Sequence, residues 1–171
     1  MSTSLAIYGA RAWVFGDDVD TDLLAPSAYL KEAPEIMATH CLEALDPGFA
    51  AAVRPGDAFV AGHNLGVGSS LEQAPEALKA LGVRVVLAAS FGRIFYRNAL
   101  NLGLPALVCS RIERIETGHL LDVDPLAGTV RDRTCGEVLA CEPLPEHVVE
   151  MIADGGLLAH LARRLRADGD R

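Results

Sequence analysis

Residues 59–109 alternate between short apolar runs and segments with helical character, and this alternation most restricts the fold. The run VRVVLAAS (83–90) is rich in β-branched residues, as expected for a strand buried on both faces. Helical segments are predicted at about 76–81, ending at Gly82, and at about 92–102, ending at Gly103, because glycine commonly follows a helix. With strands at PGDAFVAG and LPALVC, the order strand–loop–helix–strand–helix–strand predicts an α/β fold with parallel pairing.

The flanking segments extend this arrangement. A short strand is predicted at 11–15, and a helix is predicted from Pro34 to about Ala44, because proline favours the first helical position. The stretches GHLLDVD and GTVRD indicate a β-hairpin or β layer. Two helical pieces broken at Gly155-Gly156 end the chain. No repeat or low-complexity linker interrupts residues 1–171, which we interpret as a single domain.

Charge and hydropathy exclude two classes of partner. The formal net charge of −8 argues against nucleic-acid binding, which needs a basic surface. The sequence has no signal-peptide pattern and no apolar segment long enough to span a membrane, so a cytoplasmic location without membrane contact is expected. The cysteines are scattered without a C-x-x-C pair, which predicts reduced thiols and no metal or iron–sulfur site on this chain. They are Cys41, Cys109, Cys135 and Cys141.

The glycine-rich stretch AGHNLGVGSSLEQAP (61–75) admits two readings. It is neither a P-loop nor a dinucleotide fingerprint, because the required lysine and third glycine are missing. One interpretation is a capping box, in which Ser69 is the N-cap of a helix and Glu72 lies three residues later. Pro75 weakens it, because proline fits better at the first position of a helix that starts later. A structural cap and an anion site are therefore about equally supported.

Two other polar patterns are weaker evidence for a binding site. Asp18, Asp20 and Asp22 alternate as in a calcium loop, but the glycine and the closing glutamate are missing, so turn residues are expected. Arg93 and Arg97 share one helical face, and a surface or interface ion pair is favoured over ligand contact.

Four stretches, taken together in their order, resemble 3-isopropylmalate dehydratase small subunits. They are FGDDVDTDLLAPSAYL, VAGHNLGVGSSLEQAP, SFGRIFYRNALNLGLPALVC and PLPEHVVEMIADGGLLAHLARRL, and the resemblance runs from about Arg11 to Leu165. It implies a three-layer β/β/α swivelling domain like the C-terminal domain of aconitase.

The resemblance also implies chemistry shared between two chains. A large subunit would carry a [4Fe–4S] cluster, and this chain would bind no cofactor itself. The reaction would be dehydration and rehydration of a hydroxy di- or tricarboxylate in leucine biosynthesis, with a base and a Lewis acid. Ser69 falls on the family's base, Gly68 and Ser70 on substrate contacts, and Asp22 and His63 on supporting positions around it.

The departures from the family bear on the substrate. Leu71 and Gln73 replace an arginine and a histidine, and Val67 replaces a cysteine. Losing a carboxylate-binding arginine requires another cation, a different substrate group or a degenerate site. The specificity loop falls on Tyr29, Leu30 and Lys31, where Lys31 is either a substrate contact or a solvated charge.

Two alternatives to an isopropylmalate enzyme follow from these departures. One is the small subunit of a related alkylmalate, citraconate or homoaconitate hydratase. The other is a non-catalytic assembly or regulatory subunit.

Overall fold

A computed structural model describes residues 4–169, and within that range seven strands form one mixed sheet in the order β4-β3-β2-β1-β5-β6-β7. The first four strands pair in parallel, whereas β5, β6 and β7 are antiparallel. The strands are β1 (Ile7–Val14), β2 (Ala58–Ala61), β3 (Val85–Ala88), β4 (Ala106–Val108), β5 (Leu120–Asp124), β6 (Thr129–Asp132) and β7 (Val138–Ala140). The α/β fold predicted from the alternating pattern is confirmed.

Strand β1 joins the two parts of the sheet. Its first half pairs antiparallel with β5 and its last three residues pair in parallel with β2. The register shifts between Ile7 and Ala10, where Gly9 has φ +65°. A bulge bends a strand, and glycine adopts this conformation without a steric penalty. The bend lets the antiparallel strands turn away from the parallel ones.

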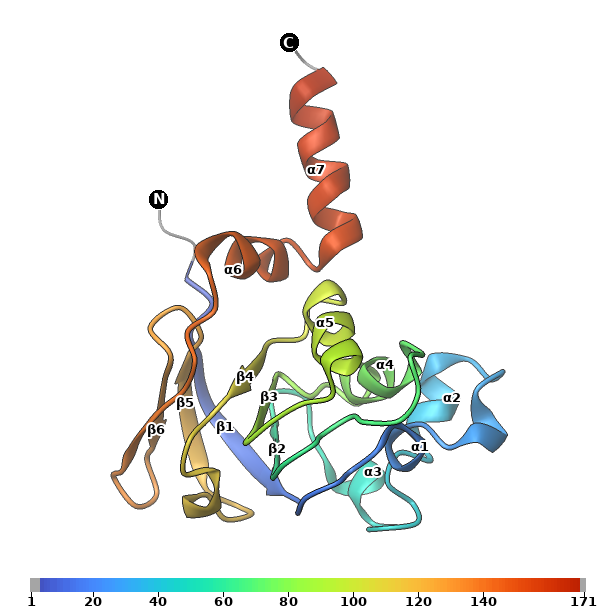
Figure 1. The fold of residues 1–171 in the computed structure, drawn as a ribbon, viewed down its shortest axis with the longest axis vertical. Helices are drawn as coiled ribbons and strands as arrows, with labels where there is room; N and C mark the ends of the chain where they lie inside the picture. Colours follow the sequence, from blue (N-terminus) through green and yellow to red (C-terminus); the bar gives the residue numbers. More distant parts are fainter. Residues whose placement is uncertain (1–3, 170–171) are drawn as a thin grey trace.

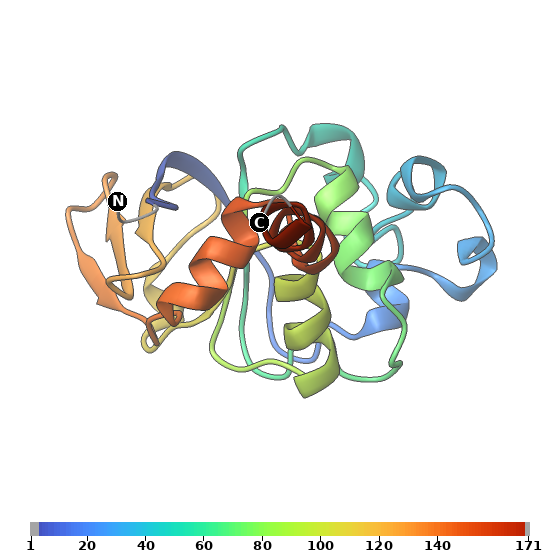
Figure 2. The ribbon, with the colours of Figure 1, turned by 90° about the horizontal axis from the view of Figure 1, so that it is seen from above.

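The buried side chains show three layers. Along β2, Ala58 and Val60 belong to one core cluster, which also contains Leu121 and Val130 of the antiparallel strands. Phe59 and Ala61 alternate to the opposite face and pack in a second cluster with the helices. Figure 2 shows the antiparallel strands at one side of the molecule and helices α2 and α4 at the other. Helix α6 instead packs in the first cluster, through Val149 and Ile152. The β/β/α arrangement implied by the family resemblance is confirmed.

Helices cover one face of the parallel strands and follow the last strand (Figure 1). They are α1 (Thr21–Leu24), α2 (Pro34–Ala38), α3 (Phe49–Ala52), α4 (Gln73–Ala80), α5 (Arg93–Asn101), α6 (Glu146–Ala153) and α7 (Leu157–Gly169), with 3-10 turns at Ser27–Tyr29 and Ile112–Arg114. Helices α4 and α5 are the connections between successive parallel strands, as such pairing requires. None of the helices in residues 4–169 is both long and apolar enough to cross a membrane.

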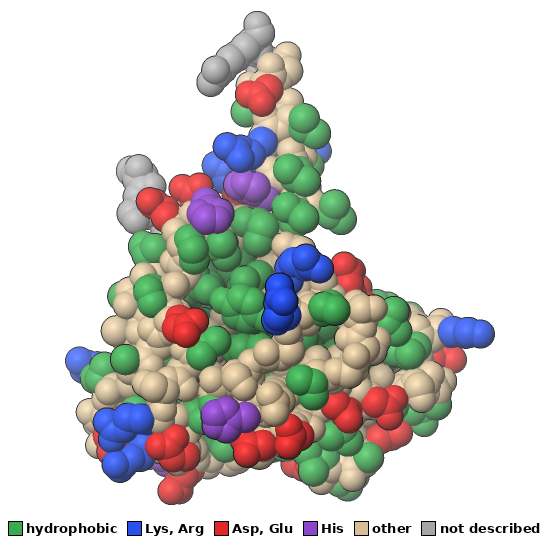
Figure 3. All heavy atoms as spheres, viewed as in Figure 1, with side chains coloured by type: hydrophobic (Ala, Val, Ile, Leu, Met, Phe, Trp, Pro, Cys, Tyr) green, Lys and Arg blue, Asp and Glu red, His purple; other side chains and the backbone are tan. Residues whose placement is uncertain are grey.

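Helix α7 projects from the body, and none of its described residues is buried (Figure 1). Leu158, Leu161 and Leu165 are 83%, 46% and 72% exposed and recur at helical spacing. Figure 3 shows hydrophobic side chains gathered along one side of this helix. Packing therefore supports α7 only near its base.

Several element boundaries differ from the sequence predictions. Helix α2 begins at Pro34 as predicted, but it ends at Ala38 instead of about Ala44. Leu42, at φ +61°, adopts the left-handed conformation and cannot continue a helix. Strand β1 begins four residues before the predicted start at Arg11. The short helices α1 and α3 were not predicted, because four residues are too few to show helical periodicity.

The prediction that all four cysteines are reduced is wrong in one pair. Cys109, after β4, forms a disulfide with Cys141, after β7, and their Cα atoms are 4.1 Å apart. The two residues form an antiparallel bridge between chain segments 32 positions apart. Of the other two, Cys135 is exposed and Cys41 is buried, and burial raises the pKa of the Cys41 thiol to about 12.

Candidate active site

The glycine-rich loop packs directly on the start of α5. Gly66 has φ +80°, and a Cβ there would collide with the ring of Phe95. A Cβ on Gly92 would lie 2.9 Å from the Gly66 carbonyl oxygen, closer than real Cβ contacts allow. The Gly92 N–H donates to the Leu65 carbonyl at 2.8 Å. Gly66 is therefore needed because the Phe95 side chain packs against it, and Gly92 is needed because its backbone touches that of Gly66. These two contacts fix α5 beside the loop.

Ser69 is held at its backbone and accepts at its side chain. Its N–H donates to Oγ1 of the buried Thr21 at 2.9 Å. Its Oγ accepts from the Leu71 N–H at 3.1 Å. An N–H donor aimed at a hydroxyl oxygen stabilises negative charge that develops there. The sequence analysis did not predict that Thr21 holds the Ser69 backbone, although Thr21 directly precedes the predicted site residue Asp22.

The capping-box interpretation of Ser69 and Glu72 is wrong. Helix α4 begins at Gln73, and Glu72 occupies the N-cap position without a side-chain cap hydrogen bond. Pro75 was predicted at the first position of the helix, but it is the third helical residue. It is still tolerated, because the first-turn N–H groups have no partner within the helix. Residues 69–72 therefore form the approach loop, which leaves the Ser69 hydroxyl available to a ligand.

A cavity of about 450 Å³ opens between this loop and α5, and we call it the cationic cavity. Ser69 and the glycines of the loop line one side, and Arg93, Ile94 and Arg97 line the other. Within residues 4–169, no carboxylate lies within ion-pair distance of either guanidinium. The surface ion pair expected for the two arginines is therefore not formed within residues 4–169, where both line a cavity instead, and an ion pair at an interface with another chain stays a prediction.

A second cavity of about 150 Å³ lies beside the first, and Ser69 lines both. We call it the apolar cavity, because its exposed wall is mainly apolar, formed by Leu30, Leu71 and neighbouring alanines. Asp22 and Gln73 also line it. The Asp22 carboxylate accepts from the Ser27 N–H at 3.0 Å, which fixes the turn that carries Leu30.

The acidic stretch before α1 acts in turns and caps, as predicted. Asp20 is the N-cap of α1 and accepts from the Leu23 N–H at 2.8 Å. Asp17 accepts from the His63 N–H at 2.7 Å, which joins this stretch to the loop after β2. These bonds bring Thr21 and Asp22 to the glycine-rich loop.

Other predicted site residues lie around the cavities without lining them. The Ser70 carbonyl accepts from Asn98 Nδ2 of α5 at 3.3 Å, a contact the sequence did not indicate. Tyr29 stacks on His40 with ring centroids 3.5 Å apart, and Lys31 is exposed. His63 lines a different cavity that contains the disulfide. Substrate contact by Ser70, Tyr29 and Lys31 stays a prediction, and so does the supporting role of His63.

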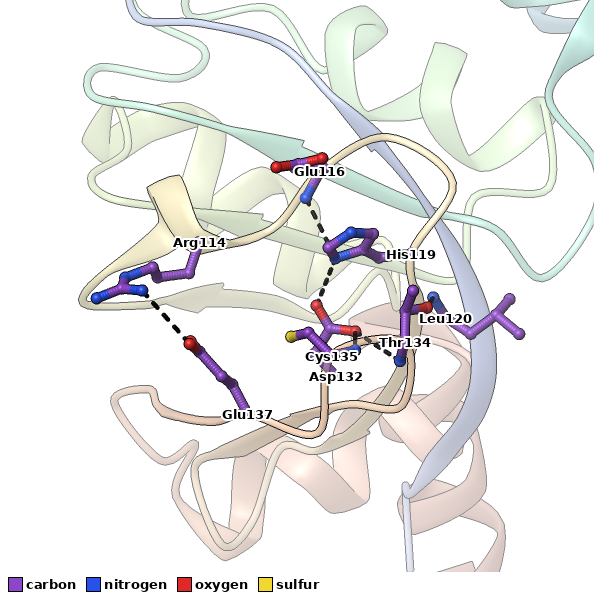
Figure 4. Close-up of polar contacts among 8 residues, drawn as sticks. All are labelled: Arg114, Glu116, His119, Leu120, Asp132, Thr134, Cys135 and Glu137. Atoms are coloured by element: carbon purple, nitrogen blue, oxygen red, sulfur yellow. Dashed lines mark hydrogen bonds and ion pairs between the residues drawn. The ribbon is translucent and has the colours of Figure 1, made fainter.

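A separate cluster, His119, Asp132 and Cys135, has the residue types of a metal site (Figure 4). Both oxygens of the Asp132 carboxylate already accept hydrogen bonds, one from His119 Nδ1 at 2.6 Å and the other from the Thr134 N–H at 2.9 Å. Burial raises the pKa of Asp132, but the hydrogen bonds from His119, Cys135 and the turn backbone outweigh burial and lower it. The cluster anchors the turn after β6.

Comparisons with known proteins give a consistent result. The Aconitase C-terminal domain family model matches residues 46–111. The 3-isopropylmalate dehydratase small subunit 1 of Methanopyrus kandleri is 48% identical, over 90% of this chain and 91% of that protein. The isopropylmalate/citramalate isomerase small subunit of Methanocaldococcus jannaschii is 43% identical, over 94% and 96%. The crystal structure of a 3-isopropylmalate dehydratase from the same organism superposes with a TM-score of 0.90, at 38% identity over 96% and 98% of the two chains.

Proposed function

The chain belongs to the family of 3-isopropylmalate dehydratase small subunits, and we propose that it is the small subunit of such a hydro-lyase, acting in leucine biosynthesis in the cytoplasm. Its substrate is a hydroxy diacid that is dehydrated to an enoic diacid and then rehydrated. As a single swivelling domain of residues 1–171, the chain closes over a large subunit.

The observation that carries this proposal is the environment of the Ser69 hydroxyl. The reaction breaks a C–H bond next to a carboxylate and a C–O bond on the neighbouring carbon, so a base must take the proton. A serine hydroxyl becomes an effective base only when its anion is stabilised. The Leu71 N–H donates to Ser69 Oγ, and the same cavity is lined by two arginines that have no carboxylate partner within residues 4–169. Both features favour a negative oxygen and a negative substrate.

Departure of the hydroxide needs a Lewis acid. The cysteines in the described part of this chain are not placed to bind an iron–sulfur cluster that could supply one. Cys109 and Cys141 are joined in a disulfide, Cys41 is buried with a raised pKa, and Cys135 lies beside His119 and Asp132, away from the other cysteines' thiols. Cluster binding needs neighbouring thiolates. We therefore assign the [4Fe–4S] cluster to the large subunit, where it would supply the Lewis acid.

Activity of the two-subunit complex tests the proposal. The chain is expressed with a large subunit, the cluster is reconstituted without oxygen, and enoate formation is followed by ultraviolet absorbance. Isopropylmalate turnover should be abolished by Ser69→Ala and retained in Ser110→Ala. The control serine lies after β4, where its Oγ donates to the Ala140 carbonyl. A complex that carries its cluster but turns over no hydroxy diacid would favour the non-catalytic assembly subunit instead.

A smaller alkylmalate is the second candidate substrate. The M. jannaschii relative is named an isopropylmalate/citramalate isomerase small subunit. The apolar cavity beside Ser69 favours an uncharged substituent of either size over the additional carboxylate of a homoaconitate-type substrate. Comparing kcat/KM for the two alkylmalates in the same complex separates them.

A further inference from the structure

The two edge strands of the sheet meet at one end. Strands β4 and β7 lie at opposite edges in the strand order, yet Cys109 and Cys141, which directly follow them, form an antiparallel bridge. We call residues 108–110 and 140–142 the seam. Two backbone hydrogen bonds, of 2.8 and 3.3 Å, cross it. The sheet is therefore closed at this end by a short seam, and the disulfide is its only covalent link within residues 4–169.

A disulfide is informative in the compartment proposed for this chain. The cytoplasm keeps most thiols reduced, and the disulfides found there are usually transient, catalytic or redox-sensing. A disulfide that responds to cytoplasmic thiols must be within their reach, because exchange needs a thiolate to contact one of the two sulfur atoms. Access to the seam therefore decides whether this disulfide can exchange.

A cavity of about 510 Å³, separate from the two that Ser69 lines, gives this access, and we call it the seam cavity. Both Cys109 and Cys141 line it. Cys141 is partly exposed, whereas Cys109 is only 1% exposed. An entering thiol therefore reaches the sulfur of Cys141 first, and Cys109 is the residue that leaves.

The charged lining of the seam cavity indicates the kind of thiol that fits. Arg111, Glu113 and Glu142 all line it and are exposed. Within residues 4–169, none of the three forms an ion pair. A guanidinium matches a carboxylate, and a carboxylate matches an ammonium group. A thiol that carries both groups, as amino-acid and small-peptide thiols do, is therefore complementary to this lining.

The seam lies at the same end of the sheet as the candidate active site. Cys109 and Ala89 directly follow the parallel strands β4 and β3, and His63 lies just after β2, on the segment that leads to Ser69. Ala89 and His63 line the seam cavity together with the disulfide. A reaction at the disulfide therefore takes place beside the segment that carries the catalytic serine.

We propose that the Cys109–Cys141 disulfide is a thiol–disulfide exchange site for an amino-acid or peptide thiol that enters the seam cavity. The thiolate attacks Cys141 Sγ, the S–S bond breaks, and Cys109 leaves as a thiolate with the bonding electron pair. A second thiolate then displaces Cys141, so that two small thiols are oxidised to one disulfide and the protein disulfide is reduced. The two protons of the small thiols pass through solvent to the two cysteines.

Reduction removes the covalent link and leaves the two backbone hydrogen bonds as the closure of the seam. The exchange thereby loosens the closed end of the sheet. It goes beyond the proposed function and depends only on its cytoplasmic location. The three tests below use the full chain and read no hydro-lyase activity, so they hold or fail independently of the proposed reaction.

Oxidised glutathione traps the first step. Cys109→Ser should form a mixed disulfide with one glutathione at Cys141, whereas Cys141→Ser should form little at Cys109, because Cys109 is buried. Peptide mass mapping separates both sites from the exposed Cys135, which should be modified in both variants as a positive control. Modification of Cys109 to an equal or greater extent, or of neither seam cysteine, would overturn the proposal.

Reduction kinetics of the wild-type disulfide test the cavity. The rate should rise linearly with the concentration of reduced glutathione, and Arg111→Gln should lower it about threefold, as expected for loss of an exposed ion pair. The same variant should leave the rate with uncharged β-mercaptoethanol unchanged, and Arg84→Gln, an exposed arginine outside the cavity lining, should change neither rate. A rate independent of thiol concentration means that unfolding must come first, which overturns the proposal. Equal effects of Arg111→Gln with both thiols overturn the assigned thiol class.

Hydrogen exchange tests the loosening. The Glu142 amide, which bonds to the Val108 carbonyl across the seam, should exchange about tenfold faster or more in the reduced chain. Amides within β2, whose neighbours on both sides are paired strands, should not change and serve as the internal control. An unchanged Glu142 amide after complete reduction would show that the disulfide does not hold the seam and would overturn the proposal.

Discussion

Replacing Gly66 with alanine is expected to destabilise the chain by about 2–5 kcal/mol. Two effects add. The residue has φ +80°, which costs an L-residue about 1–2 kcal/mol. In addition, the new Cβ would overlap the buried Phe95 ring, and overpacking of this kind costs about 1–3 kcal/mol.

Gly56→Ala measures the conformational part of this cost alone, so its difference from Gly66→Ala gives the steric part. Gly56 has a comparable φ of +97°, but nothing lies within 4 Å of where its Cβ would be. It should therefore cost only the conformational 1–2 kcal/mol or so. Urea unfolding followed by far-ultraviolet circular dichroism gives both values, provided that the m-value is unchanged.

A double-mutant cycle checks the assigned contact. Phe95→Ala alone should cost about 3–5 kcal/mol, and the Gly66→Ala/Phe95→Ala variant should be more stable than the sum predicts, because the overlap is gone. Equal costs for the two glycine substitutions, together with additivity in the cycle, would refute the close-contact explanation of the loop.

Three further predictions concern the chain outside the site. Burial raises the pKa of Asp57, but hydrogen bonds from the Arg11 guanidinium, the Arg54 backbone N–H and the Trp13 indole outweigh burial and lower it. The ionised Asp57 therefore stabilises the folded chain fully at pH values above the ordinary pKa of 3.8, and this stabilisation is lost as the pH falls through the lowered pKa. Asp57→Asn should therefore lower the free energy of unfolding by about 1–3 kcal/mol at neutral pH. It should also reduce the loss of that free energy below about pH 4, measured by urea unfolding at several pH values. An unchanged loss at acid pH would contradict this prediction. Thiol titration without reductant should find Cys135 reacting quickly and Cys41 only after unfolding, whereas four thiols in the unfolded chain would rule out the disulfide. Hydrogen exchange of the isolated chain should be fast in the outer turns of α7 and slow in α5, because no residue of α7 is buried; equal protection would mean that α7 is packed in solution.

The parallel part of the fold could be predicted from the sequence because its signals are local. A continuous apolar run marks β3, and Gly82 and Gly103, both at positive φ, follow α4 and α5 as helix-ending glycines do. The antiparallel hairpin of β5 and β6 was found in the same way. The ends of α2 and the disulfide were not, because Leu42 and the Cys109–Cys141 pair are determined by tertiary contacts.

The candidate site was only partly predictable. Ser69 stood out through its loop and the family resemblance, but the surroundings depend on segments distant in sequence. Spacing placed Arg93 and Arg97 on one face without showing what that face meets. Only the close contact between Gly66 and Gly92 puts them beside Ser69. Thr21 and Asn98 contribute through single hydrogen bonds that no sequence pattern reports.

The pairing of β1 with both β2 and β5 has a consequence for how the chain folds. Ile7 pairs with Val123, roughly two thirds of the chain away, and contacts over such separations slow folding. During synthesis the parallel strands and the loop carrying Ser69 emerge before β5 exists. Until then the antiparallel-pairing half of β1 is an unpaired edge, the kind of surface through which nascent chains aggregate. Among the seven strands of residues 4–169, β1 is thus the first to be made and among the last to have both neighbours in place.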